Sequence, residues 1–277
     1  MLSAVPPPST GEVLAGYDAL ADIYSHVPPL IMWRAWEYAV YRRHQLIGPV
    51  LDVGCGDGRF FERVFPAVRD VTGVDHDAAI VELARESGRY TTVHRSEAHQ
   101  LPFPGGTFQS VFANCSLEHM NRIDDVLAEI HRVLRPGGTL LFSVVTDQFV
   151  TRAPLQWALA AAGAPERGRA AQARHEAYHH LVNPFPQAEW LRRVEAAGLQ
   201  VRTTAPIVNG AAGWVFLLLD QLWHLERQKA GDVGGEIRGW FETAPDRTEA
   251  LRRVFEGLLL MSAGADDHAG LVVVATR

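Results

Sequence analysis

Cysteine, lysine and clustered positive charge are all scarce in this sequence. Only two cysteines occur among 277 residues, which argues against a disulfide framework and fits a reducing cytosol, so we expect a cytoplasmic protein. Lys229 is the only lysine, and the net charge of −6 is spread along the chain without a basic block. Because binding to DNA or RNA usually needs a clustered basic face, no nucleic-acid partner is predicted.

Long apolar runs are missing as well. The longest lies within Trp214–Leu219, far short of the roughly 20 residues that a membrane helix needs. The opening residues, MLSAVPPPST, lack the basic stretch and apolar core of a signal peptide. The sequence therefore predicts no secretory leader and no stable membrane insertion, and it leaves the oligomeric state open.

What is present is a hydrophobic fraction of 47% in a chain long enough for one elaborated domain, or at most two. Residues 1–15 are expected to form a flexible arm and residues 16–47 an N-terminal helical lid. Strand-like and helix-like segments then alternate in a domain over residues 48–277, with helical insertions at 147–185 and 211–266. This alternation predicts parallel βαβ units with helices on both faces of an α/β sheet.

A glycine-rich loop, VLDVGCGDG at 50–58, follows the first predicted strand. Gly54, Gly56 and Gly58 permit sharp turns and a close approach to a ligand, because no Cβ intervenes. Asp75 ends the next predicted strand, where an acid can hold a ribose diol. The spacing is G-x-G-x-G and not the dinucleotide G-x-G-x-x-G, and a buried carboxylate at Asp52 suits a cationic cofactor better than a pyrophosphate.

With these features, the chain resembles the class I S-adenosylmethionine-dependent methyltransferases. The resemblance implies a Rossmann-like sheet of seven mostly parallel strands with an antiparallel last strand. It also implies S-adenosyl-L-methionine as cofactor and a small-molecule acceptor, possible acceptors including apolar or aromatic ones. The segments that carry the resemblance are GYDALADIYS (16–25), VLDVGCGDG (50–58), VTGVDHD (71–77), SEAHQLPFPGGTFQSVFANCSLEHM (96–120), RVLRPGGTLLFSV (132–144) and HHLVNPFPQAEWLRRVEAAGLQV (179–201).

The resemblance also assigns roles to individual residues. The methionine moiety is expected to be lined by the glycine loop, through Asp52, Gly54, Cys55, Gly56 and Gly58. The ribose and adenine are expected to be bound by Asp75, His76, Glu97 and Ala98. Asn114 and Cys115 are expected beside the sulfonium, and Tyr17 and Tyr24 over the cofactor. Glu97 stands where the family usually has Asp. Core packing is the alternative for both tyrosines, and for both cysteines the alternative is that they are ordinary buried residues.

Methyl transfer from a sulfonium needs alignment and, for some acceptors, removal of a proton. A histidine with a pKa near neutrality suits the second task. His119 and His180 are the predicted catalytic residues, with His179 as a further candidate, because all three are expected near the carboxyl ends of the strands. The alternative for His119 is cofactor-side packing or helix capping, and for His179 and His180 it is a solvated or structural role.

Three other functions compete with this interpretation. HEAYHH, His175 to His180, contains the zinc-hydrolase pattern H-E-x-x-H through His175, Glu176 and His179, but no third ligand is evident, so no metal is predicted. A nicotinamide oxidoreductase would need the longer glycine spacing. A methyltransferase-like protein that binds the cofactor without turnover stays open. The acceptor is expected to be chosen by the two insertions, and the apolar stretch 214–226 within the second is interpreted as core, lid or dimer seam.

Overall fold

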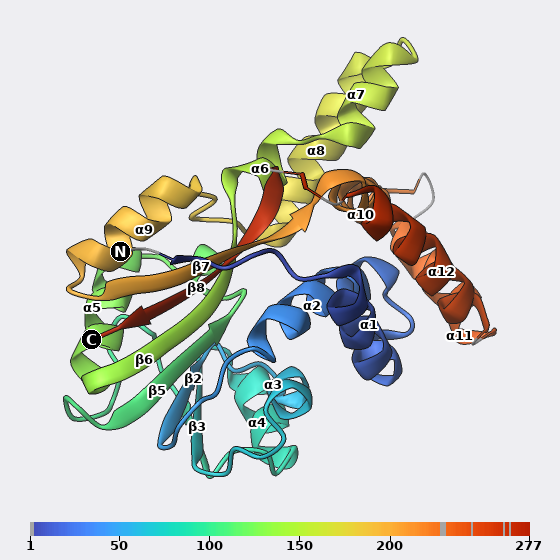
Figure 1. The fold of residues 1–277 in the computed structure, drawn as a ribbon. Helices are drawn as coiled ribbons and strands as arrows, with labels where there is room; N and C mark the ends of the chain where they lie inside the picture. Colours follow the sequence, from blue (N-terminus) through green and yellow to red (C-terminus); the bar gives the residue numbers. More distant parts are fainter. Residues whose placement is uncertain (1–2, 228–230, 245, 263, 266) are drawn as a thin grey trace.

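The computed structural model describes residues 3–227, 231–244, 246–262, 264–265 and 267–277. Within them, eight strands form one sheet in the order β1-β7-β8-β6-β5-β2-β3-β4, and only β8 runs antiparallel to its neighbours (Figure 1). This confirms the predicted Rossmann-like sheet of seven mostly parallel strands with an antiparallel last strand. The strands are β1 (Ser3–Ala4), β2 (Val50–Val53), β3 (Val71–Asp75), β4 (Thr92–Arg95), β5 (Phe108–Asn114), β6 (Leu134–Val145), β7 (Gln200–Asn209) and β8 (His268–Thr276).

The eighth strand, β1, is a short edge strand inside the segment predicted as a flexible arm. Its two residues pair in parallel with Thr203 and Thr204 of β7, and a helix begins at Thr10. Residues 1–2 of the predicted arm lie outside the described residues. The division into arm, lid and elaborated domain stays a prediction.

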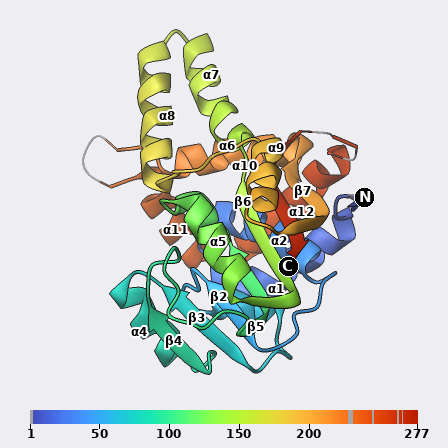
Figure 2. The same ribbon diagram turned by 90° about the vertical axis from the view of Figure 1, so that its left-hand side faces the viewer.

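Helices cover both faces of the sheet. Successive strand residues point to opposite sides, so one strand can contribute to an apolar cluster on each face. Val50 of β2 belongs to one apolar cluster, which includes residues of α1, α2, α3, α10 and α12. Leu51 and Val53 belong to a second cluster, which includes residues of α5 and α9 (Figure 2). The helices are α1 (Thr10–Tyr24), α2 (Pro28–Tyr41), α3 (Arg59–Val64), α4 (Ala78–Glu86), α5 (Ile123–Val133), α6 (Asp147–Thr151), α7 (Pro154–Ala161), α8 (Pro165–His179), α9 (Gln187–Ala196), α10 (Gly210–Trp223), α11 (Val233–Glu242) and α12 (Asp246–Met261), with a 3-10 turn at Leu117–His119.

The N-terminal helices and the helices between β7 and β8 pack against each other, although they lie at opposite ends of the chain. Phe255 of α12 places its ring 5.9 Å from that of Tyr17 and 5.2 Å from that of Trp36. Arg252 of α12 also binds the Asp18 carboxylate at 2.8 Å. These two segments therefore form one helical layer beside the sheet.

Helices α7 and α8 form a hairpin that projects from the body of the protein (Figures 1 and 2). A Cβ added at Gly168 would lie 2.7 Å from the carbonyl oxygen of Gln156, so a side chain at this position would push the two helices apart. The inner end of α8 returns to the sheet, and α8 ends at His179. Among the described residues, no helix is both long and apolar enough to cross a membrane.

Candidate active site

Three glycines shape the loop that follows β2, and all three have positive φ. The φ angles of Gly54, Gly56 and Gly58 are +72°, +55° and +79°. Gly54 is also sterically required, because an added Cβ would lie 2.6 Å from the Ser116 Cβ. Its backbone N–H donates to the Val74 carbonyl at 2.8 Å, which ties the loop to β3. The loop is thus held open at the carboxyl ends of adjacent parallel strands, where this class of sheet binds ligands.

Asp75, at the end of β3, faces this loop. Its Oδ2 accepts the Gly56 N–H at 3.3 Å, and its Oδ1 accepts the Asp77 N–H at 3.1 Å. The side chain lines a cavity and is partly exposed to it. A carboxylate oriented in this way can accept hydrogen bonds from the hydroxyls of a bound ligand.

Asp52 is 2% exposed, and burial raises its pKa to about 7, even though a hydrogen bond from Tyr90 opposes the rise. The Tyr90 hydroxyl donates to Asp52 Oδ2 at 2.7 Å and makes a longer contact with the Cys55 carbonyl at 3.1 Å. Sequence reasoning missed Tyr90, which lies two residues before β4 and belongs to no quoted motif. Because a nearby cation favours the ionised form of a carboxyl group, this site suits a positively charged ligand.

Two adjoining cavities, of about 390 and 200 Å³, share Gly54 and Gly56 and are together called the glycine-loop pocket. Twelve of the thirteen predicted cofactor residues line it. In the larger cavity they are Gly54, Gly56, Asp75, His76, Glu97, Ala98 and Cys115, and the smaller one adds Tyr24, Asp52, Cys55, Gly58 and Asn114. Residues far apart in the sequence therefore meet around one space.

Tyr17 is the predicted cofactor residue that lies elsewhere. It is 1% exposed, packs against Phe255, and donates its hydroxyl to the Thr248 carbonyl at 3.0 Å. It lines neither cavity of the glycine-loop pocket. The amphipathic pattern of α1 carries Tyr17 into the helical layer, which is the core-packing alternative for this residue.

A further cavity of about 330 Å³, called here the helix pocket, adjoins the glycine-loop pocket. It collects side chains from α2, from the 3-10 turn after β5, from the first insertion and from the helices between β7 and β8. Apolar and aromatic residues make up much of its wall, and seven of the seventeen lining residues are charged residues or histidines. The lining residues are Val27, Leu30, Trp33, Arg34, Cys115, Glu118, His119, Val145, Phe149, Tyr178, His179, Leu181, Phe216, Asp220, Trp223, His224 and Arg238.

Cys115 and His119 line both pockets and mark their junction. The Cys115 thiol donates to Glu37 Oε1 at 3.0 Å and accepts the Trp33 indole N–H at 3.2 Å. Burial, followed by the nearby Glu37 carboxylate, raises the pKa of Cys115 well above its ordinary value, and burial also raises that of Cys55. Both thiols are therefore protonated and poor nucleophiles at neutral pH.

His119 faces the junction, whereas His180 does not. The His119 side chain is exposed and lines both pockets, yet enough protein surrounds it that desolvation lowers its pKa below the ordinary value. Its Nδ1 lies 3.4 Å from the backbone carbonyl of His180. The His180 side chain is exposed and lines neither pocket, and His179 is the member of this pair that lines the helix pocket.

Two charged residues at the junction, one buried and one partly buried, escaped sequence reasoning. Glu118 is fully buried, neither of its carboxyl oxygens has a hydrogen-bond partner among the described residues, and burial raises its pKa to about 7. Arg34 lines both pockets and donates to Glu37 at 2.6 Å, while its Nε has no partner in the described part of the chain. The sequence signal for Arg34 was a single charge within the apolar stretch LIMWRAW (30–36), and Glu118, in the 3-10 turn, carried no signal of its own.

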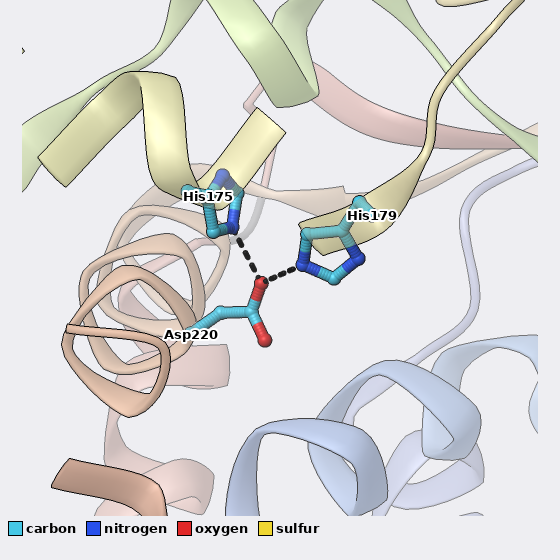
Figure 3. Close-up of side chains that lie close together, drawn as sticks. All are labelled: His175, His179 and Asp220. Carbon is cyan, nitrogen blue, oxygen red and sulfur yellow. Dashed lines mark hydrogen bonds and ion pairs between the residues drawn. The ribbon is translucent and has the colours of Figure 1, made fainter. Parts of the chain in front are cut away.

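A second polar cluster lies at the wall of the helix pocket and contains the two histidines of the H-E-x-x-H match. Asp220 Oδ2 accepts hydrogen bonds from Nε2 of His175 at 2.7 Å and Nε2 of His179 at 2.9 Å (Figure 3). Helix α8 spans the motif and α10 supplies Asp220, a partner that the sequence did not reveal. The hydrogen bonds from both histidines help to lower the pKa of Asp220, against the effect of burial, so the carboxylate is ionised.

Comparisons of the sequence with known proteins find methyltransferases. A family model described as "Methyltransferase domain" matches residues 51–142. A ubiquinone/menaquinone biosynthesis C-methyltransferase from Rhizobium johnstonii is 30% identical over 228 residues, which cover 73% of this chain and 86% of that protein. A malonyl-acyl-carrier-protein O-methyltransferase from Erwinia pyrifoliae is 29% identical over 42% of this chain, and the chain spans less than half of that relative, 44%.

Solved structures share the fold at low sequence identity. The 4+2 cyclase SpnF aligns with a TM-score of 0.55 and 20% identity over 99% of both chains. A geranyl diphosphate C-methyltransferase from Streptomyces coelicolor aligns with a TM-score of 0.54 and 17% identity, over 90% of this chain and 79% of that one. These likenesses show the fold, and the cyclase illustrates that one fold can host different reactions.

Proposed function

The chain belongs to the class I S-adenosylmethionine-dependent methyltransferase family, and from this premise we propose that it methylates a small molecule held in the helix pocket. The observation that carries the proposal is the junction of two pockets at Cys115 and His119. One pocket collects the residues expected to hold the cofactor, and the other offers separate room for an acceptor. Their volumes suit small ligands.

The glycine-loop pocket fits S-adenosyl-L-methionine in three respects. No protein atom lies within 4 Å of the position that a Cβ at Gly56 would take, so a ligand can approach the backbone there closely. Asp75 presents a carboxylate for the ribose hydroxyls, and the buried Asp52 gains from a nearby ammonium group. When bound, the cofactor supplies a methyl group activated by a sulfonium whose departure leaves a neutral thioether.

The helix pocket supports an acceptor with an apolar or aromatic body and at least one polar group. Trp33, Phe149 and Phe216 contribute aromatic walls, and their rings contact one another at 5.4 to 6.4 Å between centroids. Glu118 and His119 add polar atoms near the junction. Such a pocket excludes water and aligns the acceptor, and alignment supplies several kcal/mol of the barrier reduction in reactions of this kind.

His119 is the residue that we assign to proton removal. It lies at the junction, and its lowered pKa keeps the imidazole neutral at neutral pH. If Nδ1 donates to the His180 carbonyl, Nε2 is left as the acceptor for an acidic proton of the substrate. Acceptors that need no deprotonation would use His119 only to shape the site.

Calorimetry with S-adenosylhomocysteine tests the cofactor half of this proposal. We expect one binding site, and Asp75→Asn should weaken binding by about 10- to 100-fold, because a charged hydrogen-bond partner is lost. Tyr17→Phe is the matched control and should bind normally, since Tyr17 lies outside the pocket. Absence of binding to the unmodified protein would overturn the proposal.

A methyl-transfer screen with small hydroxylated and aromatic acceptors tests the catalytic half. Consumption of the cofactor that depends on the acceptor supports a methyltransferase. Tight binding without turnover on any acceptor would support the alternative, a cofactor-binding protein that does not methylate. The likeness in fold to a cyclase is the observation that favours keeping this second candidate.

A further inference from the structure

We propose that His175, His179 and Asp220 form a binding site for one divalent transition-metal ion of the zinc type. One potential ligand atom from each residue lies within 4.8 Å of the other two. The histidines stand one turn apart on α8, and the carboxylate comes from α10, which packs beside it (Figure 3). Two separate elements thus aim three metal-binding groups at one point.

The donor set selects the type of ion. Two imidazole nitrogens and one carboxylate are the ligands of zinc sites that keep an open fourth position, whereas magnesium and calcium prefer oxygen donors. Tetrahedral ligands at zinc distances are separated by about 3.3 Å. The two Nε2 atoms now lie 2.7 and 2.9 Å from Asp220 Oδ2, so the carboxylate would have to withdraw by roughly 0.5 Å to admit an ion.

The surroundings make a cation favourable at this point. His175 is 1% exposed and the Asp220 side chain 9%, and a buried carboxylate is costly unless it is neutralised. In the described part of the chain, the ion-pair partners of Asp220 are histidines and include no arginine or lysine. His224 stands close by, with its Nε2 3.8 Å from Asp220 Oδ1.

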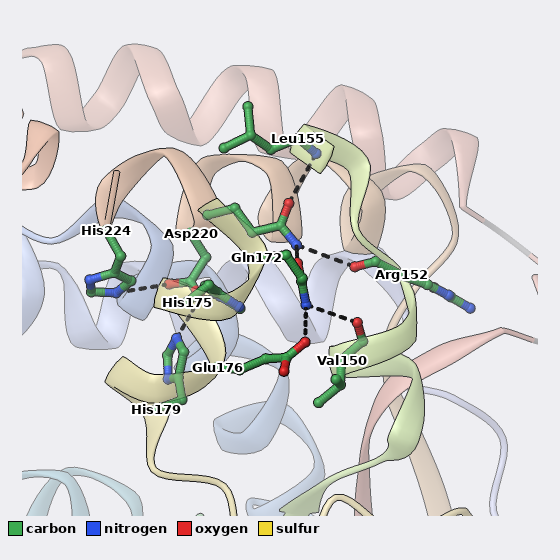
Figure 4. A network of polar contacts seen from close by, with 10 residues as sticks. Val150, Arg152, Leu155, Gln172, His175, Glu176, His179, Asp220 and His224 are labelled. Carbon is green, nitrogen blue, oxygen red and sulfur yellow. Dashed lines mark hydrogen bonds and ion pairs between the residues drawn. The ribbon is translucent and has the colours of Figure 1, made fainter. Parts of the chain in front are cut away.

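Packing and hydrogen bonds hold the donors in place. Phe149 stacks on His175, with ring centroids 5.3 Å apart and planes at 20°. Gln221 accepts the Leu155 N–H at 3.0 Å and donates to Gln172 at 3.1 Å, which links α10 to α7 and α8 (Figure 4). The stacking positions the His175 ring, and the glutamine bonds fix the helices that carry the donors. In the described part of the chain, Nδ1 of His175 has no hydrogen-bond partner.

The site differs from that of a zinc hydrolase, although the sequence pattern is the same. Glu176, the general base of the H-E-x-x-H pattern, is exposed and accepts a hydrogen bond from Gln172 at 2.7 Å (Figure 4). It belongs to neither the trio nor the lining of the helix pocket. The structure therefore offers metal ligands without a hydrolytic base beside them.

The open position of the ion faces the helix pocket, because His179 and Asp220 both line it. We infer that the ion binds an oxygen atom of the acceptor and fixes its orientation, while the reacting atom lies toward Cys115 and His119. This role rests on the proposed methyl transfer. The metal site itself does not, since it depends only on the three ligands.

Metal binding can be measured without an acceptor. The protein is stripped with a chelator and titrated with Zn²⁺ by calorimetry and with Co²⁺ by visible absorption, which reports tetrahedral coordination. We expect one ion per chain. His179→Ala and Asp220→Asn should each weaken binding by at least about 100-fold, because loss of outer partners alone costs 10- to 100-fold.

Two matched control variants distinguish the trio from neighbouring polar side chains on and beside α8. Glu176→Gln and His180→Ala should bind the metal within about threefold of the unmodified protein, because both side chains are exposed and outside the trio. His179 is only partly buried, so His179→Ala keeps the test valid if Asp220→Asn fails to fold. Absence of one-site binding, or ligand variants that bind the metal as tightly as the unmodified protein does, would overturn the proposal. Binding of S-adenosylhomocysteine by the stripped protein shows whether the methyltransferase proposal stands independently.

Discussion

The glycine-loop pocket and the helix pocket are built in different ways. The first takes most of its wall from loops that follow neighbouring strands, and its residues form recognisable local motifs. The second is assembled from five separate helices and a 3-10 turn, with lining residues from Val27 to Arg238. We conclude that the part of the site set by sheet topology can be recognised in the sequence, and that the part set by helix packing cannot.

Replacement of His119, at the junction, should have the largest effect. His119→Ala is expected to lower turnover by about 10²- to 10⁴-fold on an acceptor that must lose a proton. His180→Ala should lower it much less, because that side chain lies outside both pockets. Steady-state kinetics on an acceptor found by the screen would measure both.

The pH profile refines this comparison. Desolvation lowers the pKa of His119, so the acidic limb of turnover should lie below the ordinary histidine value of about 6.5. The limb should vanish in His119→Ala. Equal turnover of the unmodified protein and both variants at neutral pH would remove His119 and His180 from the mechanism.

A pair of glycine variants tests the glycine-loop pocket. Gly54→Ala and Gly56→Ala both place a side chain at positive φ, but only the first creates a clash, 2.6 Å from the Ser116 Cβ, whereas Gly56 has open space. We expect Gly54→Ala to lower the free energy of unfolding by about 2–4 kcal/mol and Gly56→Ala by about 1 kcal/mol. Urea denaturation measures both, and equal losses would contradict the close packing of the loop on Ser116.

Two buried carboxyl groups, one in each pocket, provide the third comparison. The pKa values of Asp52 and Glu118 are both raised to about 7, chiefly by burial. Because the folded-state pKa exceeds the unfolded value, each group favours folding when protonated, and stability falls as pH rises from about 4 to 7. Asp52→Asn and Glu118→Gln should each flatten this fall, as measured by urea denaturation at several pH values.

Ligand binding should separate the two groups. A cationic cofactor is bound better by ionised Asp52, so affinity for S-adenosylhomocysteine should weaken as pH drops below 7, by up to about tenfold per unit. Asp52→Asn should abolish this dependence, and Glu118→Gln should keep it. The same dependence in both variants would show that the ammonium group does not lie near Asp52.

Cysteine labelling should show the smallest effect. Both thiols are protonated at neutral pH, so alkylation will be slow with or without ligand. Bound S-adenosylhomocysteine should slow the labelling of Cys115, which lines the glycine-loop pocket, by a further factor of a few. Mass spectrometry of the two cysteine peptides gives both rates, and unchanged rates would argue against the predicted placement of the thiols.

Much of the sheet could be predicted because each strand is a short apolar run set between helices. The exception is β1, whose two residues are too few to form a pattern and depend on pairing with β7. Because β2 pairs in parallel with both β3 and β5, Gly54, Asp75 and Cys115 lie together at the carboxyl ends of these three strands. Topology alone was enough to gather these residues.

The helix pocket was harder because its polar groups meet only through packing. Asp220 lies in the apolar stretch of α10, and the sequence does not reveal that α8 brings two histidines to it. Glu118 and Arg34 likewise depend on the approach of α2 to the end of β5. Tyr17 shows the opposite case, since a tyrosine that the resemblance assigns to the cofactor packs into the helical layer, outside both pockets.

A crystal structure with S-adenosylhomocysteine tests the central claim most directly. We predict that the ligand fills the glycine-loop pocket, with Asp75 on the ribose hydroxyls and the sulfur at the junction marked by Cys115 and His119, facing an open helix pocket. A ligand bound elsewhere, or with its sulfur turned away from the helix pocket, would contradict the claim that these two pockets form one methyl-transfer site.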